Sequence, residues 1–385
     1  MKATNGNPVL LVDNPHEFDA LVSYLGTLPS IGLDTEFVRT NTFYANLGLV
    51  QISDEKNCYL IDPHKVESWN GFAELLDNPG VATVIHSSSE DLSVLKVSVG
   101  GSPSSLFDSQ LASAFLGDGF SLSYQALVKL ILDVELDKNE TRSDWVKRPL
   151  SASQIKYAAD DVCYLLTLKE NLEEQLRKTN KLNWFNDECL KQITAAAVAE
   201  NKSYWEISYT NINKAWVLKR PNLEHLQQLC FWRESKARKL NKPRNWIAKD
   251  KDLLSLALAA TGVVSPTKER LNKVELEDRN LIKDFGDEIL ALIKEPISDL
   301  APVDENLLNH PLNSIAKTKL RKCQAVVLEV AQALSMAPEL LGRKRALQEF
   351  IRNSELHGEL RWSGEFSGWR REVLEEKFVS VFKSS

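Results

Sequence analysis

Strand-like and helix-like segments alternate along the first 180 residues and then cease to alternate, which limits the fold more than any other feature. Short runs rich in β-branched residues and bounded by turn residues are expected as strands at Val9–Val12, Gly32–Val38, Leu49–Ile52, Tyr59–Ile61 and Ala82–His86. Helical spacing is found at His16–Leu25, Trp69–Leu76, Asp91–Val97, Ser109–Leu116 and Ser123–Leu132, and in a long stretch from Ala152 to about Arg177. This alternation predicts an α/β domain, a mixed sheet flanked by helices, that ends near residue 175.

The remainder of the chain shows almost no strand pattern. From Asn183 onward, helical patterns are separated by short breakers such as Arg220-Pro221 and Glu295-Pro296. Two basic stretches, Arg233–Lys251 and Arg343–Arg352, each lie next to a Leu-rich helical pattern, which indicates two related all-α modules. The predicted organisation is therefore a first domain over 1–175, a helical linker over 176–209, and helical-bundle domains over 210–292 and 300–375.

Composition narrows the class of protein. The 385 residues are 43% hydrophobic and 26% charged, which is ordinary for globular proteins and excludes wholesale disorder. The five cysteines lack the spacing of a zinc site or a disulfide framework. No apolar run is long enough to span a membrane and the first residues do not resemble a signal peptide, so we expect a cytoplasmic protein. The absence of a heptad pattern favours a monomer.

The net charge of −6 is unevenly distributed along the chain. Residues 1–180 contain 14 Lys and Arg against 25 Asp and Glu, whereas the remaining residues contain 33 against 28. The segment Lys214–Asp252 has 11 basic and four acidic residues, interleaved with aromatic residues. Such a stretch is typical either of a face that holds RNA phosphates or of a solvated helix surface. The candidates for RNA contact are Arg233, Lys236, Arg238, Lys239, Lys242 and Arg244.

Two acidic residues inside one predicted strand are the strongest local signal of chemistry. Strand alternation points Asp34 and Glu36 to the same face, and Ile31, Leu33 and Phe37 around them indicate burial. Adjacent buried carboxylates need a counter-charge, and Mg²⁺ or Mn²⁺ prefers such oxygen ligands. The alternative is that one carboxylate faces solvent at the end of the strand.

Two further acidic positions lie on helical segments. Asp91 follows a strand, and Ser88-x-x-Asp91 also fits a helix capping box. Tyr157 and Asp161 lie four residues apart on the long helix that begins after Ser151, so both side chains share one helix face. Each pattern alone is also compatible with an ordinary helix end or a solvated surface. Four convergent carboxylates, however, suit two metal ions that act together on a phosphodiester.

The motifs Asp34-Thr35-Glu36, Ser89-Glu90-Asp91-Leu92 and Tyr157-x-x-x-Asp161 resemble the three exonuclease motifs of the DEDD superfamily, in its tyrosine-containing branch. The longer segments 34–53 and 136–166 are similar to the ribonuclease D family, and residues 222–257 are similar to its helicase-and-RNase-D C-terminal (HRDC) domain. The resemblance implies an α/β ribonuclease H-like exonuclease domain followed by two helical domains. It also implies a 3′→5′ exoribonuclease that releases nucleoside 5′-monophosphates, with precursor tRNA as the typical substrate.

The resemblance assigns roles to five residues. Asp34 would bridge two metal ions, Glu36 and Asp161 would complete the first metal site, and Asp91 would help to hold the second. Tyr157 would orient the attacking water, since a tyrosine with an ordinary pKa near 10 is a weak base at neutral pH. Thr35 and Glu36 are also expected to contact the end of the substrate.

Four residues between the second and third motifs are further candidates for substrate contact. Arg142, Lys147 and Arg148 supply cations and Trp145 supplies a stacking surface, although a solvated loop with a buried Trp explains the same pattern. Two other functions stay open at this point. A DNA-directed exonuclease would use the same metal site, because the phosphodiester is common to both polymers, whereas a noncatalytic RNA-binding scaffold should have lost some of the five residues.

Overall fold

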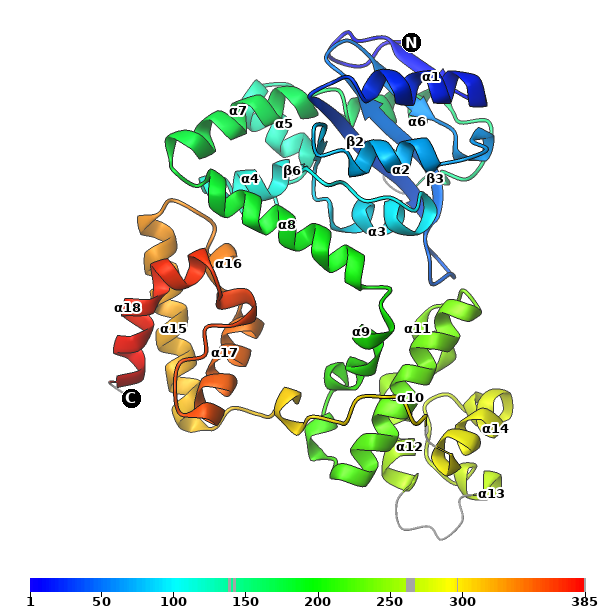
Figure 1. The fold of residues 1–385 in the computed structure, drawn as a ribbon, viewed down its shortest axis with the longest axis vertical. Helices are drawn as coiled ribbons and strands as arrows, with labels where there is room; N and C mark the ends of the chain where they lie inside the picture. Colours follow the sequence, from blue (N-terminus) through cyan, green and yellow to red (C-terminus); the bar gives the residue numbers. More distant parts are fainter. Residues whose placement is uncertain (138–139, 141–142, 261–266, 296, 384–385) are drawn as a thin grey trace.

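The computed structural model describes residues 1–137, 140, 143–260, 267–295 and 297–383. An exonuclease-like part comes first and is followed by helices that form two further groups (Figure 1). The first part contains β1 (Val9–Val12), α1 (Pro15–Leu25), β2 (Ser30–Val38), β3 (Asn46–Ser53), β4 (Cys58–Ile61), α2 (Asn70–Asp77), β5 (Ala82–Ile85), α3 (Ser89–Ser98), β6 (Leu106–Asp108), α4 (Ser109–Leu116), α5 (Tyr124–Leu132), α6 (Ala152–Asp160) and α7 (Leu165–Lys178).

The six strands form one mixed sheet in the order β1-β4-β3-β2-β5-β6. The β2–β3 and β3–β4 pairs are antiparallel, whereas β1–β4, β2–β5 and β5–β6 are parallel. Helices α1 and α2 lie over one face and α6 lies behind the sheet (Figure 1). The predicted mixed sheet flanked by helices is therefore confirmed. Strand β6 was not predicted, because its three residues are too few to show a period.

The face of the sheet that carries Asp34 is closely packed against neighbouring segments. A Cβ atom on Gly32 would lie 2.3 Å from the Ser53 Oγ atom, and one on Gly48 would lie 2.7 Å from Trp145. Glycine at these two positions lets the neighbouring segments approach the backbone. On this face Leu49, Leu60, Trp145 and Ala158 form a small apolar cluster.

The helical half begins with the linker helices α8 (Leu182–Val198) and α9 (Lys202–Glu206) and continues through α10 (Arg220–Lys239), α11 (Arg244–Ile247), α12 (Asp250–Ala260), α13 (Lys268–Leu271), α14 (Leu281–Lys294), α15 (Ser314–Ala333), α16 (Pro338–Leu341), α17 (Lys344–His357) and α18 (Trp369–Lys383). Helices α10, α12 and α14 share a separate apolar core. None of the helices in the described chain is both long enough and apolar enough to cross a membrane.

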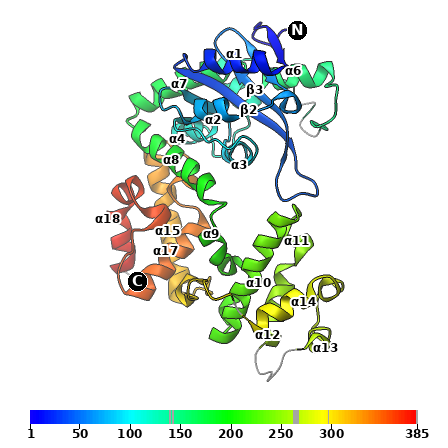
Figure 2. The same cartoon turned by 45° about the vertical axis from the view of Figure 1, so that its right-hand side comes forward.

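The last helical group docks firmly on the exonuclease-like part. Its buried residues belong to the same apolar core as the sheet. The Trp184 ring on α8 stacks on the Trp369 ring with 5.1 Å between centroids, and the Ala337 N–H donates to the Ala114 carbonyl. Helices α10 to α14 lie on the other side of the molecule, below the loop between β2 and β3 (Figure 2).

Candidate active site

Three of the predicted carboxylates converge in the structure. Asp34 and Glu36 project from β2, and Asp161 directly follows α6 on the same face of the sheet. One carboxylate oxygen from each of the three residues lies within 4.8 Å of the others. The β2–β3 pairing shifts register between Glu36 and Phe37, so an irregularity of the kind that often lies next to active sites follows the second acid directly.

Asp91 approaches from the N-terminal end of α3. Its Oδ1 atom accepts hydrogen bonds from the Thr35 N–H at 3.2 Å and from the Thr35 hydroxyl at 2.5 Å. The alternative of a simple capping box is not realised, because the Ser88 side chain makes no capping hydrogen bond. Thr35 thus ties Asp91 to the strand between Asp34 and Glu36, and the four carboxylates Asp34, Glu36, Asp91 and Asp161 are called the acidic site below.

Tyr157 and Asp161 share the third element, as the spacing predicted. The Ser151–Gln154 capping box starts α6, and the Asp161 N–H donates to the Tyr157 carbonyl at 3.0 Å. A hydrogen bond from the Tyr157 side chain lowers the pKa of Asp161, although burial has the larger, opposite effect. The predicted single long helix is wrong in one respect, because the chain breaks at 161–164 before α7 begins at Leu165. The break places Asp161 at a helix end, where its side chain reaches the sheet.

Burial raises the pKa of every carboxyl in the acidic site. The pKa of Glu36 rises to about 9 and those of Asp91 and Asp161 rise to about 7, while that of Asp34 lies well above its usual range. Repulsion from the neighbouring carboxylates adds to the shifts of Asp34 and Glu36. No lysine or arginine of the described chain is among the main influences on these pKa values. An acidic, oxygen-only site without an internal counter-ion fits a divalent cation.

Asp108 is a residue of this region that the sequence interpretation missed. Its carboxylate accepts from the backbone N–H groups of Ser87 and Ser88 and also caps α4 through the N–H groups of Gln110 and Leu111. It therefore fixes the loop that leads into α3 and to Asp91. An Asp-Ser pair immediately before a helical pattern was the available signal.

Two of the predicted substrate contacts near residue 145, Trp145 and Arg148, have partners within the protein. The Trp145 ring is buried 6.0 Å from the Tyr157 ring, so the alternative of a buried Trp describes its position. Arg148 forms a two-pronged ion pair with Asp62 at 2.7 and 2.8 Å and also donates to the Gly48 carbonyl. Lys147 is exposed. Arg142 lies outside the described residues.

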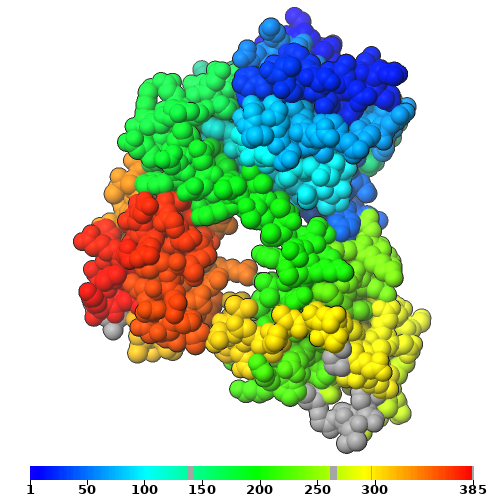
Figure 3. Space-filling model, in the orientation of Figure 1, coloured from blue at the N-terminus to red at the C-terminus, as the bar shows by residue number. Residues whose placement is uncertain are grey.

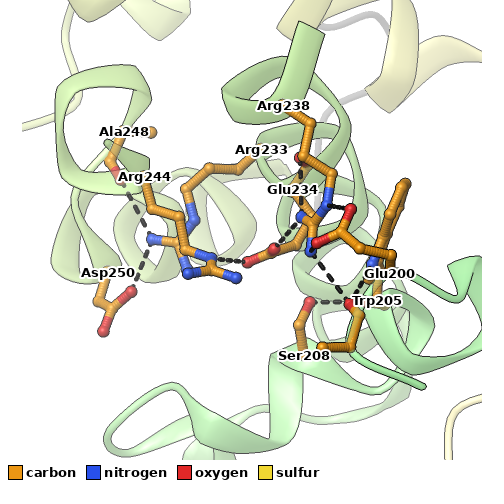
Figure 4. A network of polar contacts seen from close by, with 10 residues as sticks. Glu200, Trp205, Ser208, Arg233, Glu234, Arg238, Arg244, Ala248 and Asp250 are labelled. Carbon is orange, nitrogen blue, oxygen red and sulfur yellow. Dashed lines mark hydrogen bonds and ion pairs between the residues drawn. The ribbon is translucent and has the colours of Figure 1, made fainter. Parts of the chain in front are cut away.

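The basic residues predicted on α10 and after it differ in their surroundings. Arg233 is buried and pairs with Asp250 at 2.6 Å, and Lys236 pairs with Glu288 at 2.5 Å. Figure 4 shows Arg233, Arg238 and Arg244 turned toward carboxylates of the protein itself. Lys239 and Lys242 are exposed to solvent. The three arginines and Lys236 are therefore already paired with carboxylates of the protein itself.

Arg238 is the centre of a compact group of charges, shown in Figure 4 and named here the Arg238 cluster, that consists of Glu200, Glu234, Arg238 and Arg244. Arg238 pairs with Glu200 at 3.0 Å and with Glu234 at 2.6 Å, and Arg244 pairs with Glu234 at 2.5 Å. The Arg238 guanidinium also lies 4.5 Å from the Phe43 ring of the β2–β3 loop. This cluster therefore joins the helical half to the loop that leaves β2.

A hollow lies between the exonuclease-like part, α9 and the last helical group (Figure 3). Its volume is about 750 Å³, and the basic residues on its walls include Arg39, Lys96, Arg345 and Arg352. Glu90, which directly precedes Asp91, also lines it and pairs with Arg39 at 2.5 Å. The hollow is thus lined by the residue that precedes Asp91 and is bordered by both basic and acidic side chains from several parts of the chain.

Comparison with known proteins agrees with this geometry. The 3'-5' exonuclease family matches residues 9–177 and the HRDC domain family matches residues 222–293. A ribonuclease D from Pseudomonas paraeruginosa is 36% identical over 359 residues, which is 93% of each chain. This chain belongs to the ribonuclease D family. Another family member, from Escherichia coli, is 32% identical over 95% of this chain and 96% of its own.

The crystal structure of Escherichia coli RNase D, described as an exoribonuclease involved in structured RNA processing, superimposes with a TM-score of 0.82 at 28% identity. The match covers 98% of this chain and 99% of the other. Two sequence predictions are confirmed by membership of the ribonuclease D family: the fold class and the enzyme class, a 3′–5′ exoribonuclease. The family also implies divalent metal ions, which the acidic site fits.

Proposed function

We propose that the protein shortens RNA from its 3′ end by hydrolysis that depends on two divalent metal ions, Mg²⁺ or Mn²⁺, and releases nucleoside 5′-monophosphates. The convergence of Asp34, Glu36 and Asp161, whose ligand oxygens lie within 4.8 Å of one another, is the observation that carries the proposal. DNA contains the same phosphodiester bond as RNA, so DNA is the control substrate.

The residues of the acidic site take distinct parts in this proposal. Asp34 would bridge both ions, Glu36 and Asp161 would hold the first, and Asp91 would hold the second. Two bound ions would lower the pKa of the attacking water and stabilise the leaving 3′ oxygen. Tyr157 would orient that water, because its side chain is hydrogen-bonded to Asp161 at the edge of the site. Thr35 holds Asp91 in place, so its hydroxyl is already used within the protein.

The RNA strand would reach the acidic site through the hollow that Arg39, Lys96, Arg345 and Arg352 border. Cations spaced along such a path bind the phosphate backbone without reading the base sequence. Lys147, Lys239 and Lys242 are exposed and are proposed to extend this contact. We infer a precursor tRNA substrate and a cytoplasmic location from the resemblance to ribonuclease D, and a monomer from the self-contained apolar cores.

Digestion of end-labelled RNA in the presence of Mg²⁺ tests the proposal. A 3′-labelled RNA should lose its label at once as a mononucleotide, and a 5′-labelled RNA should shorten stepwise, whereas Asp34→Asn should do neither. An RNA that is cut internally, or an Asp34→Asn variant as active as the wild type, would contradict the mechanism. A transfer RNA with a 3′ extension, compared with a single-stranded DNA of the same length, tests the substrate class.

A further inference from the structure

Gln51 on β3 is a buried amide without a partner. Its side chain is completely inaccessible to solvent, and within the described chain neither its Nε2 nor its Oε1 atom has a hydrogen-bond partner. An unpaired buried amide destabilises a folded protein, and an apolar side chain of similar size would avoid that penalty. The stability of the sheet therefore does not explain glutamine at this position.

The strand register places Gln51 directly opposite Asp34. Residues directly opposite each other in an antiparallel pair project to the same face, with Cβ atoms about 4.5–5.5 Å apart. Glu36, two residues along β2, projects to this face as well, and Asp161 reaches it from the end of α6. The unpaired amide therefore stands beside the carboxylate that is central to the acidic site.

The other neighbours of Gln51 along the strands of this face are apolar or already hydrogen-bonded. Leu60 lies opposite it on β4, and Leu49 lies two residues away along β3. The Ser53 hydroxyl already donates to the Val162 carbonyl at 2.7 Å. Of the two residues directly opposite Gln51 on the neighbouring strands, Asp34 and Leu60, only Asp34 carries carboxylate oxygens that accept hydrogen bonds.

We propose that Gln51 is a positioning residue, whose Nε2–H group donates to the Asp34 carboxylate and orients it when the acidic site holds its cations. Second hydrogen bonds of this kind fix the direction of metal-binding side chains. A neutral amide is suited to the task because a lysine or arginine in its place would compete with the cation for Asp34. The inference rests on the proposed metal-dependent function.

Substitution of Gln51 by methionine tests the inference, because methionine is similar in length but has no N–H group. Thr83→Val is the matched control, since the Thr83 hydroxyl is also buried and unpaired but lies on β5 opposite Ile31. Thermal unfolding without metal and calorimetric titration with Mn²⁺ alone are measured for both variants, for the wild type and for Asp34→Asn.

We expect Gln51→Met to unfold at the same or a higher temperature than the wild type and to bind Mn²⁺ about 10- to 100-fold more weakly. Thr83→Val should also unfold at the same or a higher temperature than the wild type, but its affinity for Mn²⁺ should be unchanged. Wild-type Mn²⁺ affinity in Gln51→Met, or a loss of affinity that comes with a lower unfolding temperature, overturns the positioning role. If Asp34→Asn itself binds Mn²⁺ like the wild type, the proposed metal site fails; if only Gln51→Met does so, the failure is confined to Gln51.

Discussion

The acidic site and the Arg238 cluster are both partly buried groups of charge, but they are balanced in opposite ways. In the acidic site, burial and mutual repulsion raise the pKa values, and no cation of the described chain is among the main influences on them. In the Arg238 cluster, burial would also raise the pKa of Glu234, yet hydrogen bonds from Arg244 and Arg238 outweigh it and lower the pKa. A charge cluster that is complete within the protein serves the fold, whereas an incomplete one is suited to a ligand from outside.

The largest expected effect comes from substituting two neighbouring aspartates, one inside the acidic site and one outside it. Asp161→Asn should reduce exonuclease activity by at least about 100-fold, as expected when one preorganised electrostatic group is lost. Asp160 is the control, because its carboxylate instead accepts hydrogen bonds from Thr4 and pairs with Lys156. Asp160→Asn should lower the unfolding temperature while the activity of the folded enzyme persists. Equal loss of activity in both variants would show that the acidic site is not distinct from its surroundings.

The Arg238 cluster should respond to substitution through stability. Arg238→Ala leaves Glu234 and Glu200 without one of their partners, and removal of one member of a buried ion pair costs about 3 kcal/mol. Urea unfolding measures this loss. Lys239→Ala is the control one residue along, and because Lys239 is exposed its free energy of unfolding should change by less than about 0.5 kcal/mol. If Arg238→Ala has the same free energy of unfolding as the wild type, the cluster does not hold the helical half to the β2–β3 loop.

Opposite pH dependence should separate the two clusters. The carboxyls of the acidic site keep protons in the folded chain that the unfolded chain has already released, so the stability of the metal-free protein should fall as pH rises from about 5 toward the folded pKa values of about 7 and 9. Glu234 contributes with the opposite sign: its stabilisation is present above its ordinary pKa and is lost as pH falls through the lowered one.

Unfolding temperatures measured from pH 4 to pH 9 check this dependence. Mg²⁺ should reduce the fall on the alkaline side, because the deprotonated carboxylates bind it, and Asp34→Asn should reduce the fall without metal. Arg238→Ala should leave the alkaline side unchanged. An alkaline-side fall that is the same in Asp34→Asn and in the wild type would assign it to other groups.

The smallest expected effect concerns exposed lysines. Replacement of Lys239 and Lys242 by alanine should weaken RNA binding a few-fold and reduce the dependence of log affinity on log salt by about 0.7 for each lost phosphate contact. Fluorescence anisotropy with a short labelled RNA at several salt concentrations measures both quantities. An unchanged salt dependence would remove these lysines from the proposed RNA path.

Local patterns were sufficient for much of the fold. The predicted strand Val9–Val12 and helix Ser109–Leu116 agree with the structure residue for residue, because each is bounded by turn or capping residues and its pattern is regular. The helix break at 161–164 and strand β6 were missed, because the first interrupts an otherwise continuous helical pattern and the second is too short for one. The domain boundaries and the roles of the individual site residues stay predictions.

The sequence by itself determined which side chains were available: two acids on one strand face, an acid after a strand, and a Tyr and an acid four residues apart. Only the tertiary structure decided what each charge meets. Arg238 meets Glu200 and Phe43, which are distant in sequence, and strand register places Gln51 opposite Asp34. The reason is physical, because the energy of a buried charge depends on its nearest neighbours and on its loss of water, and long-range packing sets both.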